Sequence, residues 1–333
     1  MIRRTAALVM AAVLAIAGLG GCAGSKKARS DKMQIVCTIF PAYDWTKTLL
    51  GSHEDEAEIT YLQSDGSDLH SYEPSAKDLA LISECDLFIF VGGESDSWSA
   101  DAVKNAKNKK MKKIDLLEVL GSSVKDNSLA DELDSKESEE EGSGSAAEGK
   151  AKEEPVHDEH VWLSPRNAEV FCNKITNALC ELDQLHEEDY KKNLVSYRKK
   201  LNELDIRFSE LAADSRISTL IFCDRFPFRY FAEDYGFKYY SAYSGCTSGE
   251  EASAEMLTLM SQKIDKLKIN RVFTTEQPQS GIADTVISAA ETKDIKTVKL
   301  DSMHSVDQKM IDEDTTYLSI MESNYDILEE ALS

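Results

Sequence analysis

The sequence predicts an α/β fold with two lobes of parallel β-sheet joined by one long helix. Two observations lead to this prediction. A helical apolar stripe runs through residues 186–213, and short runs of β-branched and aromatic residues alternate with helical patterns on both sides of it. Such alternation is typical of parallel sheets covered by helices. The strand-like runs lie at residues 34–40, 86–91, 219–222, 271–275 and 297–300.

The composition is that of a folded globular protein. Of 333 residues, 42% are hydrophobic and 29% are charged. At roughly 100–200 residues per domain, this length allows two domains. The formal net charge is −22, and an acidic surface repels the phosphate backbone of nucleic acids. We therefore expect no nucleic-acid partner.

The N-terminus has the features of an export signal. Two arginines precede an apolar run at residues 6–19, which is shorter than the roughly 20 apolar residues of a membrane-spanning helix. The ending Leu-Gly-Gly-Cys resembles the bacterial lipobox. This resemblance implies a signal peptide at residues 1–21, a lipid anchor at Cys22 and a polar tether at residues 22–32. We expect the protein to lie on the outer face of the bacterial cytoplasmic membrane.

The first lobe is predicted at residues 33–185. Helical patterns at residues 44–50 and 75–83 separate its strands, and the second pattern begins after a proline. Residues 126–159 break the alternation, because thirteen acidic residues and three lysines occupy them with almost no apolar side chain. A segment of this composition cannot bury a core. We expect an acidic, disordered loop inserted in the first lobe.

A linking helix is predicted at residues 186–214, and a second lobe at residues 215–333. The linking helix has one apolar face with steps of four and three residues, and its other face is densely charged. At 1.5 Å per residue it spans roughly 40 Å, which is enough to join two lobes. The apolar face consists of Tyr190, Leu194, Tyr197, Leu201, Leu204, Phe208 and Leu211.

Only six histidines occur in the chain, and two of them lie in distinctive phrases. His70 lies in Asp-Leu-His-Ser-Tyr-Glu-Pro, in the turn before a helical pattern. His160 lies in His-Asp-Glu-His-Val-Trp-Leu-Ser-Pro-Arg-Asn-Ala, just before a tryptophan and a proline. Both positions make these histidines candidates for a functional site.

These phrases resemble those of a known family, the substrate-binding lipoproteins of bacterial zinc and manganese ABC importers. The first is similar to that family's G-x-D-P-H-x-Y-E-P-[ST], and the second to its D-x-H-V-W-L-D-P-x-N-A. The resemblance covers residues 34–333, and further matches follow in the family's order. They are Phe228-Arg-Tyr-Phe231 with Tyr235-Gly236, Glu251-Ala-Ser253, Thr275-Glu276-Gln-Pro278 and Leu300-Asp301-Ser302.

The resemblance implies a receptor that binds one metal ion between its lobes. Its ligands would be His70 and His160, an imidazole or carboxylate after the first strand of the second lobe, and Asp301. Nitrogen and oxygen ligands suit Zn²⁺, with Mn²⁺ as the alternative where carboxylates dominate. Such a protein captures metal outside the cell, delivers it to an ABC permease and catalyses nothing. We expect it to be a monomer.

The chain departs from the family at Arg225, which stands where a ligand is expected. A guanidinium stays protonated and cannot ligate a cation. At about 5 Å from a +2 ion and an effective dielectric of 20, its charge would oppose binding by roughly 6–7 kcal/mol. Either Arg225 turns away to pair with a carboxylate such as Glu251, or Asp224 is presented to the metal. We favour Asp224 as the ligand.

The other histidines are assigned smaller roles. His157 is interpreted as a loop residue that hands metal inward, and His304 as an exposed residue near the site. His53 and His186 are interpreted as ordinary surface residues. A disulfide between Cys223 and Cys246 is left open, because connectivity cannot be deduced from sequence.

Two alternatives belong to other functional classes. A metallohydrolase would use an open coordination position to activate water, and Arg225 in place of a ligand would leave one. However, the sequence contains no H-E-x-x-H motif. The second alternative is a surface adhesin, a role assigned to related lipoproteins.

Overall fold

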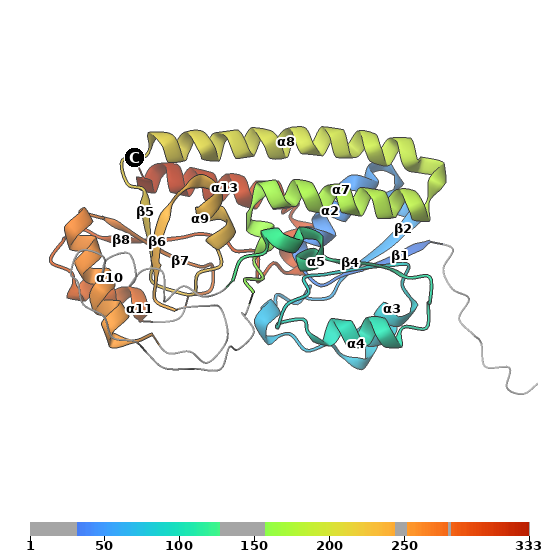
Figure 1. Ribbon diagram of the computed structural model, residues 1–333, viewed down its shortest axis with the longest axis horizontal. Coiled ribbons are helices and arrows are strands. Elements are labelled where there is room, and N and C mark those ends of the chain that lie inside the picture. Colours follow the sequence, from blue (N-terminus) through green and yellow to red (C-terminus); the bar gives the residue numbers. More distant parts are fainter. Residues whose placement is uncertain (1–31, 127–156, 244–251, 279–280, 333) are drawn as a thin grey trace, which may run out of the picture. The chain divides into compact units, whose positions relative to one another are not determined.

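The computed structural model describes residues 32–126, 157–243, 252–278 and 281–332 (Figure 1). The signal peptide, Cys22, most of the acidic loop, Cys246 and Glu251 lie outside the described residues. The chain from Met33 to Ser333 forms one compact unit. Within the described ranges, every helix is too short or too polar to cross a membrane.

The first sheet contains four parallel strands in the order β2-β1-β3-β4. The strands are β1 (Met33–Cys37), β2 (Ala57–Tyr61), β3 (Leu87–Phe90) and β4 (Lys112–Asp115). The helices associated with them are α2 (Phe40–Leu50), α3 (Ala76–Glu84), α4 (Trp98–Asn105) and α5 (Leu116–Leu120), and the 3-10 turns are η1 (Gly51–Glu56), η2 (Leu69–Ser71) and η3 (Gly121–Ser123).

The second sheet repeats this arrangement in the order β6-β5-β7-β8, again with all strands parallel. The strands are β5 (Thr219–Phe222), β6 (Lys238–Ser241), β7 (Arg271–Thr274) and β8 (Lys296–Lys299). The helices are α9 (Arg229–Tyr235), α10 (Ala254–Leu267), α11 (Ile282–Ala289), α12 (Gln308–Asp312) and α13 (Tyr317–Leu332). The predicted α/β class with two parallel sheets is therefore confirmed.

The long connecting helix is also confirmed, as α8 (Glu187–Asp214). It follows α7 (Pro165–Leu182), with η5 (Val161–Leu163) and η6 (Gln184–His186) on either side of α7. Figure 1 shows α8 running along α7 and α13, and it also contacts α2 and α9. The residues that α8 buries are Tyr190, Tyr197, Leu201, Leu204, Phe208 and Leu211, and Leu194 packs at the edge of the same cluster.

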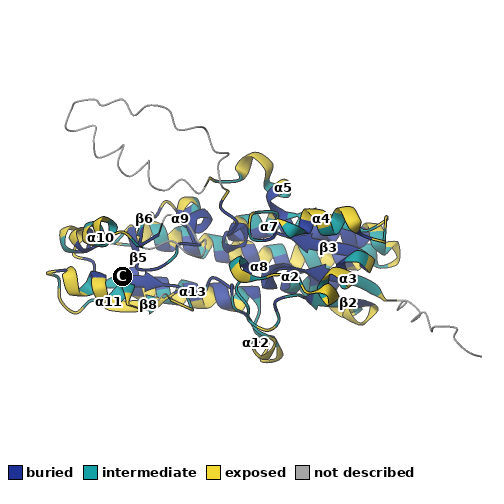
Figure 2. Ribbon diagram, turned by 90° about the horizontal axis from the view of Figure 1, so that it is seen from below, coloured by how far each residue is buried: buried dark blue, intermediate teal, exposed yellow. Residues whose placement is uncertain are grey.

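One contiguous apolar core includes residues of both sheets. Ile35 of the first sheet and Phe222 of the second belong to it, together with Trp162 and the buried face of α8. Smaller clusters lie around Phe88 and around Met260. Figure 2 shows the contrast between the buried strand β3 and the edge strand β8, which is largely exposed.

The described cysteines are all buried free thiols: Cys37, Cys85, Cys172, Cys180 and Cys223. Burial raises the pKa of the Cys223 thiol to about 12, so it is protonated at neutral pH. These cysteines therefore contribute to packing as small apolar side chains.

Asp44 provides a test of the packing between α2 and α13. The Tyr317 N–H donates to Asp44 Oδ2 at 2.9 Å, and burial raises the pKa of the Asp44 carboxyl to about 6. The folded state therefore holds a proton that the unfolded state releases at lower pH. Ionising Asp44 as the pH rises through about 6 lowers the free energy of unfolding.

We expect Asp44→Asn to raise the free energy of unfolding by on the order of 2–3 kcal/mol at pH 7.5. The gain should vanish at about pH 3 and below, where Asp44 is largely protonated in both states. The asparagine Oδ1 keeps an acceptor for the Tyr317 N–H. Urea unfolding of both proteins at the two pH values measures the difference, and a variant less stable than wild type at pH 7.5 would contradict this account.

Candidate metal site

Three imidazoles from distant parts of the chain meet in one cluster. The side chains of His70, His160 and His304 each offer a ligand atom, and these atoms all lie within 4.8 Å of one another. The Nε2 atoms of His70 and His160 are 3.1 Å apart. The ring centroids are separated by 5.0 to 5.1 Å in all three pairs. Together they form a compact set of possible nitrogen ligands.

Local hydrogen bonds hold the backbone of each histidine. The His70 N–H donates to Asp68 Oδ1 at 2.9 Å, which caps η2. The His160 N–H donates to Asp158 Oδ1 at 2.9 Å in the turn before η5. The His304 N–H donates to Glu276 Oε1 at 3.1 Å, which fixes the loop after β8.

Each ring is also held through its Nδ1 atom. Nδ1 of His70 lies 2.7 Å from the Ser95 hydroxyl, and Nδ1 of His160 lies 2.9 Å from Asp158 Oδ1. Nδ1 of His304 lies 2.9 Å from the Ser302 hydroxyl. Metal-ligating histidines characteristically engage their second ring nitrogen in this way, which fixes the tautomer and the ring orientation.

His304 gives the most direct indication of a cation site. Its Nε2 atom is buried and has no hydrogen-bond partner among the described residues. A buried polar atom normally has a partner, because leaving it unsatisfied costs about 1–3 kcal/mol. A cation bound between the imidazoles would satisfy this nitrogen.

Desolvation keeps these imidazoles neutral. Burial and the neighbouring rings of His304 and His160 lower the pKa of His70 to about 2. Burial and then His160 lower the pKa of His304 to about 4. Because a ligating histidine must be unprotonated, both rings are ready to bind a cation at neutral pH.

The expectation that His304 is exposed is wrong, since its exposed fraction is only 6%. Its ring packs against Trp162, with centroids 5.6 Å apart. Its position just after a strand was the available signal, because the carboxyl ends of parallel strands gather at one edge of a sheet. His157 is exposed and lies 3.0 Å from Asp126, outside the imidazole cluster.

Arg225 turns towards a carboxylate, that of Asp68. Its Nη2 donates to Asp68 Oδ2 at 3.0 Å, and both side chains are at least four-fifths buried. Glu251, the expected partner, lies outside the described residues. Asp68 therefore serves two purposes, since it caps the turn that holds His70 and balances the charge of Arg225.

The two predicted carboxylate ligands are not part of the imidazole group. Asp224 is fully buried, and its Oδ2 accepts hydrogen bonds from the Thr275 N–H and hydroxyl. Asp301 Oδ1 accepts from the Met303 N–H at 2.7 Å, in the turn that leads to His304. Burial, and then the Glu276 carboxylate, raise the pKa of Asp301 to about 6.

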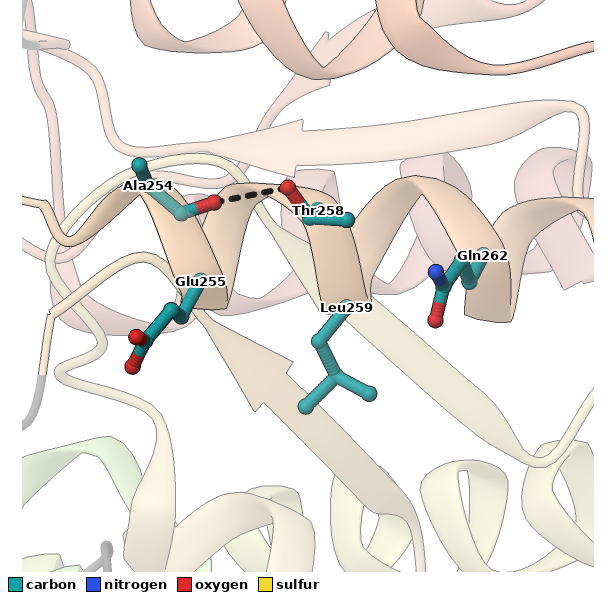
Figure 3. A pocket seen from close by; sticks show the side chains of 5 residues that line it. All are labelled: Ala254, Glu255, Thr258, Leu259 and Gln262. Carbon is teal, nitrogen blue, oxygen red and sulfur yellow. Dashed lines mark hydrogen bonds between the residues drawn. The ribbon is translucent and has the colours of Figure 1, made fainter.

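A surface hollow lies elsewhere, on α10 (Figure 3). Thr258 donates to the Ala254 carbonyl within the same helix at 2.8 Å, and no imidazole lines the hollow. It therefore has no part in the cluster of histidines. The lining side chains are Ala254, Glu255, Thr258, Leu259 and Gln262.

A known protein family whose description names zinc uptake matches most of the chain. The family described as zinc-uptake complex component A, periplasmic (ZnuA), matches residues 35–331. The chain belongs to this family. The predicted resemblance to importer receptors is confirmed.

Individual relatives agree with this membership. The zinc-binding lipoprotein AdcA of Streptococcus pneumoniae is 29% identical over 316 residues, which are 94% of this chain and 58% of AdcA. This chain therefore spans little more than half of that relative. The high-affinity zinc uptake system protein ZnuA of Bacillus subtilis is 27% identical over 327 residues, covering 98% of this chain and 96% of the relative.

A solved structure matches the fold as well. The Zn(II)-bound ZnuA-like domain of Streptococcus pneumoniae AdcA aligns with a TM-score of 0.67 and 26% identity. The alignment covers 90% of this chain and 99% of that domain. The two-lobed architecture is therefore that of the ZnuA family.

Paired substitutions test the ion pair between Asp68 and Arg225. Asp68→Asn keeps an acceptor for the His70 N–H but removes the charge that balances Arg225. At an effective dielectric of 20, one positive charge several ångström from a +2 ion opposes binding by a few kcal/mol. We therefore expect Asp68→Asn to weaken Zn²⁺ binding at least about tenfold.

Adding Arg225→Gln to Asp68→Asn should restore most of the lost affinity, because the positive charge is then removed as well. Competition titrations of the wild type, both single variants and the double variant complete the cycle. If the double variant binds Zn²⁺ as weakly as Asp68→Asn alone, the charge of Arg225 is not responsible for the loss of affinity.

Proposed function

We propose that this protein captures Zn²⁺ outside the cell and delivers it to the permease of an ABC importer. The observation that supports this most strongly is the imidazole cluster, whose rings are held through Nδ1. Within the described part of the chain, the buried Nε2 of His304 has no hydrogen-bond partner. The zinc-binding names of the AdcA and ZnuA relatives point to the same cargo.

The donor set favours zinc over manganese. Imidazole nitrogens are good ligands for Zn²⁺, whereas Mn²⁺ prefers sites rich in carboxylate and water oxygens. Three imidazoles within 4.8 Å of one another form a nitrogen-rich site. A manganese receptor is the alternative, and a Zn²⁺ against Mn²⁺ competition separates the two.

The proposed ligands are His70, His160 and His304, together with a carboxylate. Asp301 and Asp224, the residues indicated by the sequence, are the candidates for the carboxylate. We rank Asp301 first, because Asp224 Oδ2 already accepts two hydrogen bonds from Thr275. His304 belongs to the second lobe and the other histidines to the first, so separation of the lobes would open the site and release the ion.

The proposal also covers the location of the protein in the cell, its oligomeric state and its lack of catalytic activity. Lipidation at Cys22 would hold the protein on the outer face of the cytoplasmic membrane, near its permease. The protein would act as a monomeric receptor without catalytic activity. No observation on the described residues favours a metallohydrolase or an adhesin, so neither is proposed.

The three histidines provide the main test of this function. We expect His70→Ala, His160→Ala and His304→Ala each to reduce Zn²⁺ affinity at pH 7 by at least about 100-fold, because each removes a nitrogen ligand. His157→Ala is the matched control and should bind like the wild type. Near-normal affinity in any of the three variants, measured by competition with a chelator, would remove that residue from the site.

The carboxylate is tested by a second pair of variants. Asp301→Asn should lower Zn²⁺ affinity by at least about tenfold, and by more than Asp224→Asn does, because the amide oxygen is a weaker ligand than a carboxylate. Circular dichroism of both variants checks that they fold. A greater loss of affinity in Asp224→Asn would reverse the ranking.

A further inference from the structure

A second cluster of ligand atoms lies in the first lobe, between η1 and the start of α8. Among the described residues, His53, Glu56 and His186 form a group whose ligand atoms all lie within 4.8 Å of one another. The two imidazole rings stack, with centroids 3.8 Å apart and planes at 23°. The sequence suggested two ordinary surface residues, whereas the structure shows both histidines partly buried and stacked on each other.

We propose that His53, Glu56 and His186 form a second binding site for a divalent transition ion such as Zn²⁺, separate from the cluster of His70, His160 and His304. This proposal does not depend on the proposed transport function. The two sites share no residue and are built from different turns of the chain.

The spacing of the atoms fits a tetrahedral ion. Nδ1 of His53 lies 3.4 Å from Glu56 Oε1, and Nδ1 of His186 lies 3.4 Å from Glu56 Oε2. Two ligands that each lie about 2.0–2.1 Å from a tetrahedral zinc are about 3.3 Å apart. An ion could therefore be held by both nitrogens and the carboxylate once the two stacked rings rotate to point their Nδ1 lone pairs at it.

Neighbouring carboxylates complete the arrangement. Nε2 of His53 lies 3.0 Å from Asp189 Oδ2, so this carboxylate orients the ring and leaves Nδ1 for the ion. Nδ1 of His186 lies 2.7 Å from Asp183 Oδ2, which also accepts a hydrogen bond from the Tyr190 hydroxyl at 2.6 Å. On binding, the ion would replace the Nδ1 proton, and Asp183 would be within reach as a fourth ligand.

The exposure of this site differs from that of the first cluster. The His53 and His186 side chains are 15% and 18% exposed, and that of Glu56 is 55% exposed. A hydrated ion can therefore reach the ligands without any movement of the lobes. Partial hydration should also make this site weaker than the buried cluster. A bound ion would connect η1 to α8 near the turn between α7 and α8 (Figure 1).

Metal stoichiometry of the full chain tests the proposal. Titration with Zn²⁺, followed by native mass spectrometry and calorimetry, should show two ions bound to the wild type, one tightly and one more weakly. His53→Gln and His186→Gln should each lose the weaker ion. His157→Gln is the matched control, since it removes an exposed histidine outside both groups and should keep two ions.

Two further variants distinguish this second site from the cluster of His70, His160 and His304 and test the role of Asp189. His304→Ala should lose the tight ion and keep the weaker one, so the two proposals fail independently. Asp189→Asn should weaken the second ion by about 10- to 100-fold without abolishing it, the usual effect of removing a carboxylate behind a ligating histidine. Retention of the tight ion shows that the His53 and His186 variants fold.

The proposal is overturned if the wild type binds a single ion even at millimolar Zn²⁺. It is also overturned if the second ion persists unchanged in both His53→Gln and His186→Gln. Co²⁺ in place of Zn²⁺ provides an independent readout. Co²⁺ bound at the weaker site should give the strong visible absorption bands of tetrahedral cobalt in the wild type, and these bands should be absent from His53→Gln.

Discussion

The burial of one face of α8 in a core shared by both sheets is the constraint on which the rest of the structure depends. A helix with an apolar stripe is stable only where that stripe is covered. Here the cover comes from α2, α7, α9 and α13, and the resulting core includes residues of both sheets. The loops that follow the strands of the two sheets are therefore held close enough for His70, His160 and His304 to meet.

Within that frame, burial and polar contacts determine the protonation and orientation of the three imidazoles. Burial keeps His70 and His304 neutral, and oxygen atoms of Ser95, Asp158 and Ser302 hold the three rings through Nδ1. Asp68 balances the charge of Arg225 across the two lobes. A positively charged residue near the imidazole cluster is therefore tolerated, because Asp68 offsets much of its field locally.

The two histidine groups differ in burial, and this difference affects how each group would hold an ion. In the first group the rings are enclosed, so a bound ion would have to lose its water shell. In the second, around His53 and His186, the stacked rings are partly exposed and lie beside carboxylates. An ion bound in the proposed second site would therefore exchange more readily with free ions.

The sequence by itself determined the alternation of strands and helices and the extent of α8, and it singled out His70 and His160, which the structure brings together. These features are local, since they depend on periodicity or on residues close together in the chain. It missed strand β6, because Lys-Tyr-Tyr-Ser contains no β-branched residue, and helix α9, whose seven residues make only about two turns.

Only the tertiary structure decided the partner of Arg225 and the burial of His304. Asp68 is 157 positions away from Arg225 in sequence, and the ring of His304 packs against Trp162 of the first lobe. The pairing of His53 with His186 is likewise a contact between separate turns. Contacts of this kind follow from how the two sheets and α8 pack together, and no local pattern of residues encodes that packing.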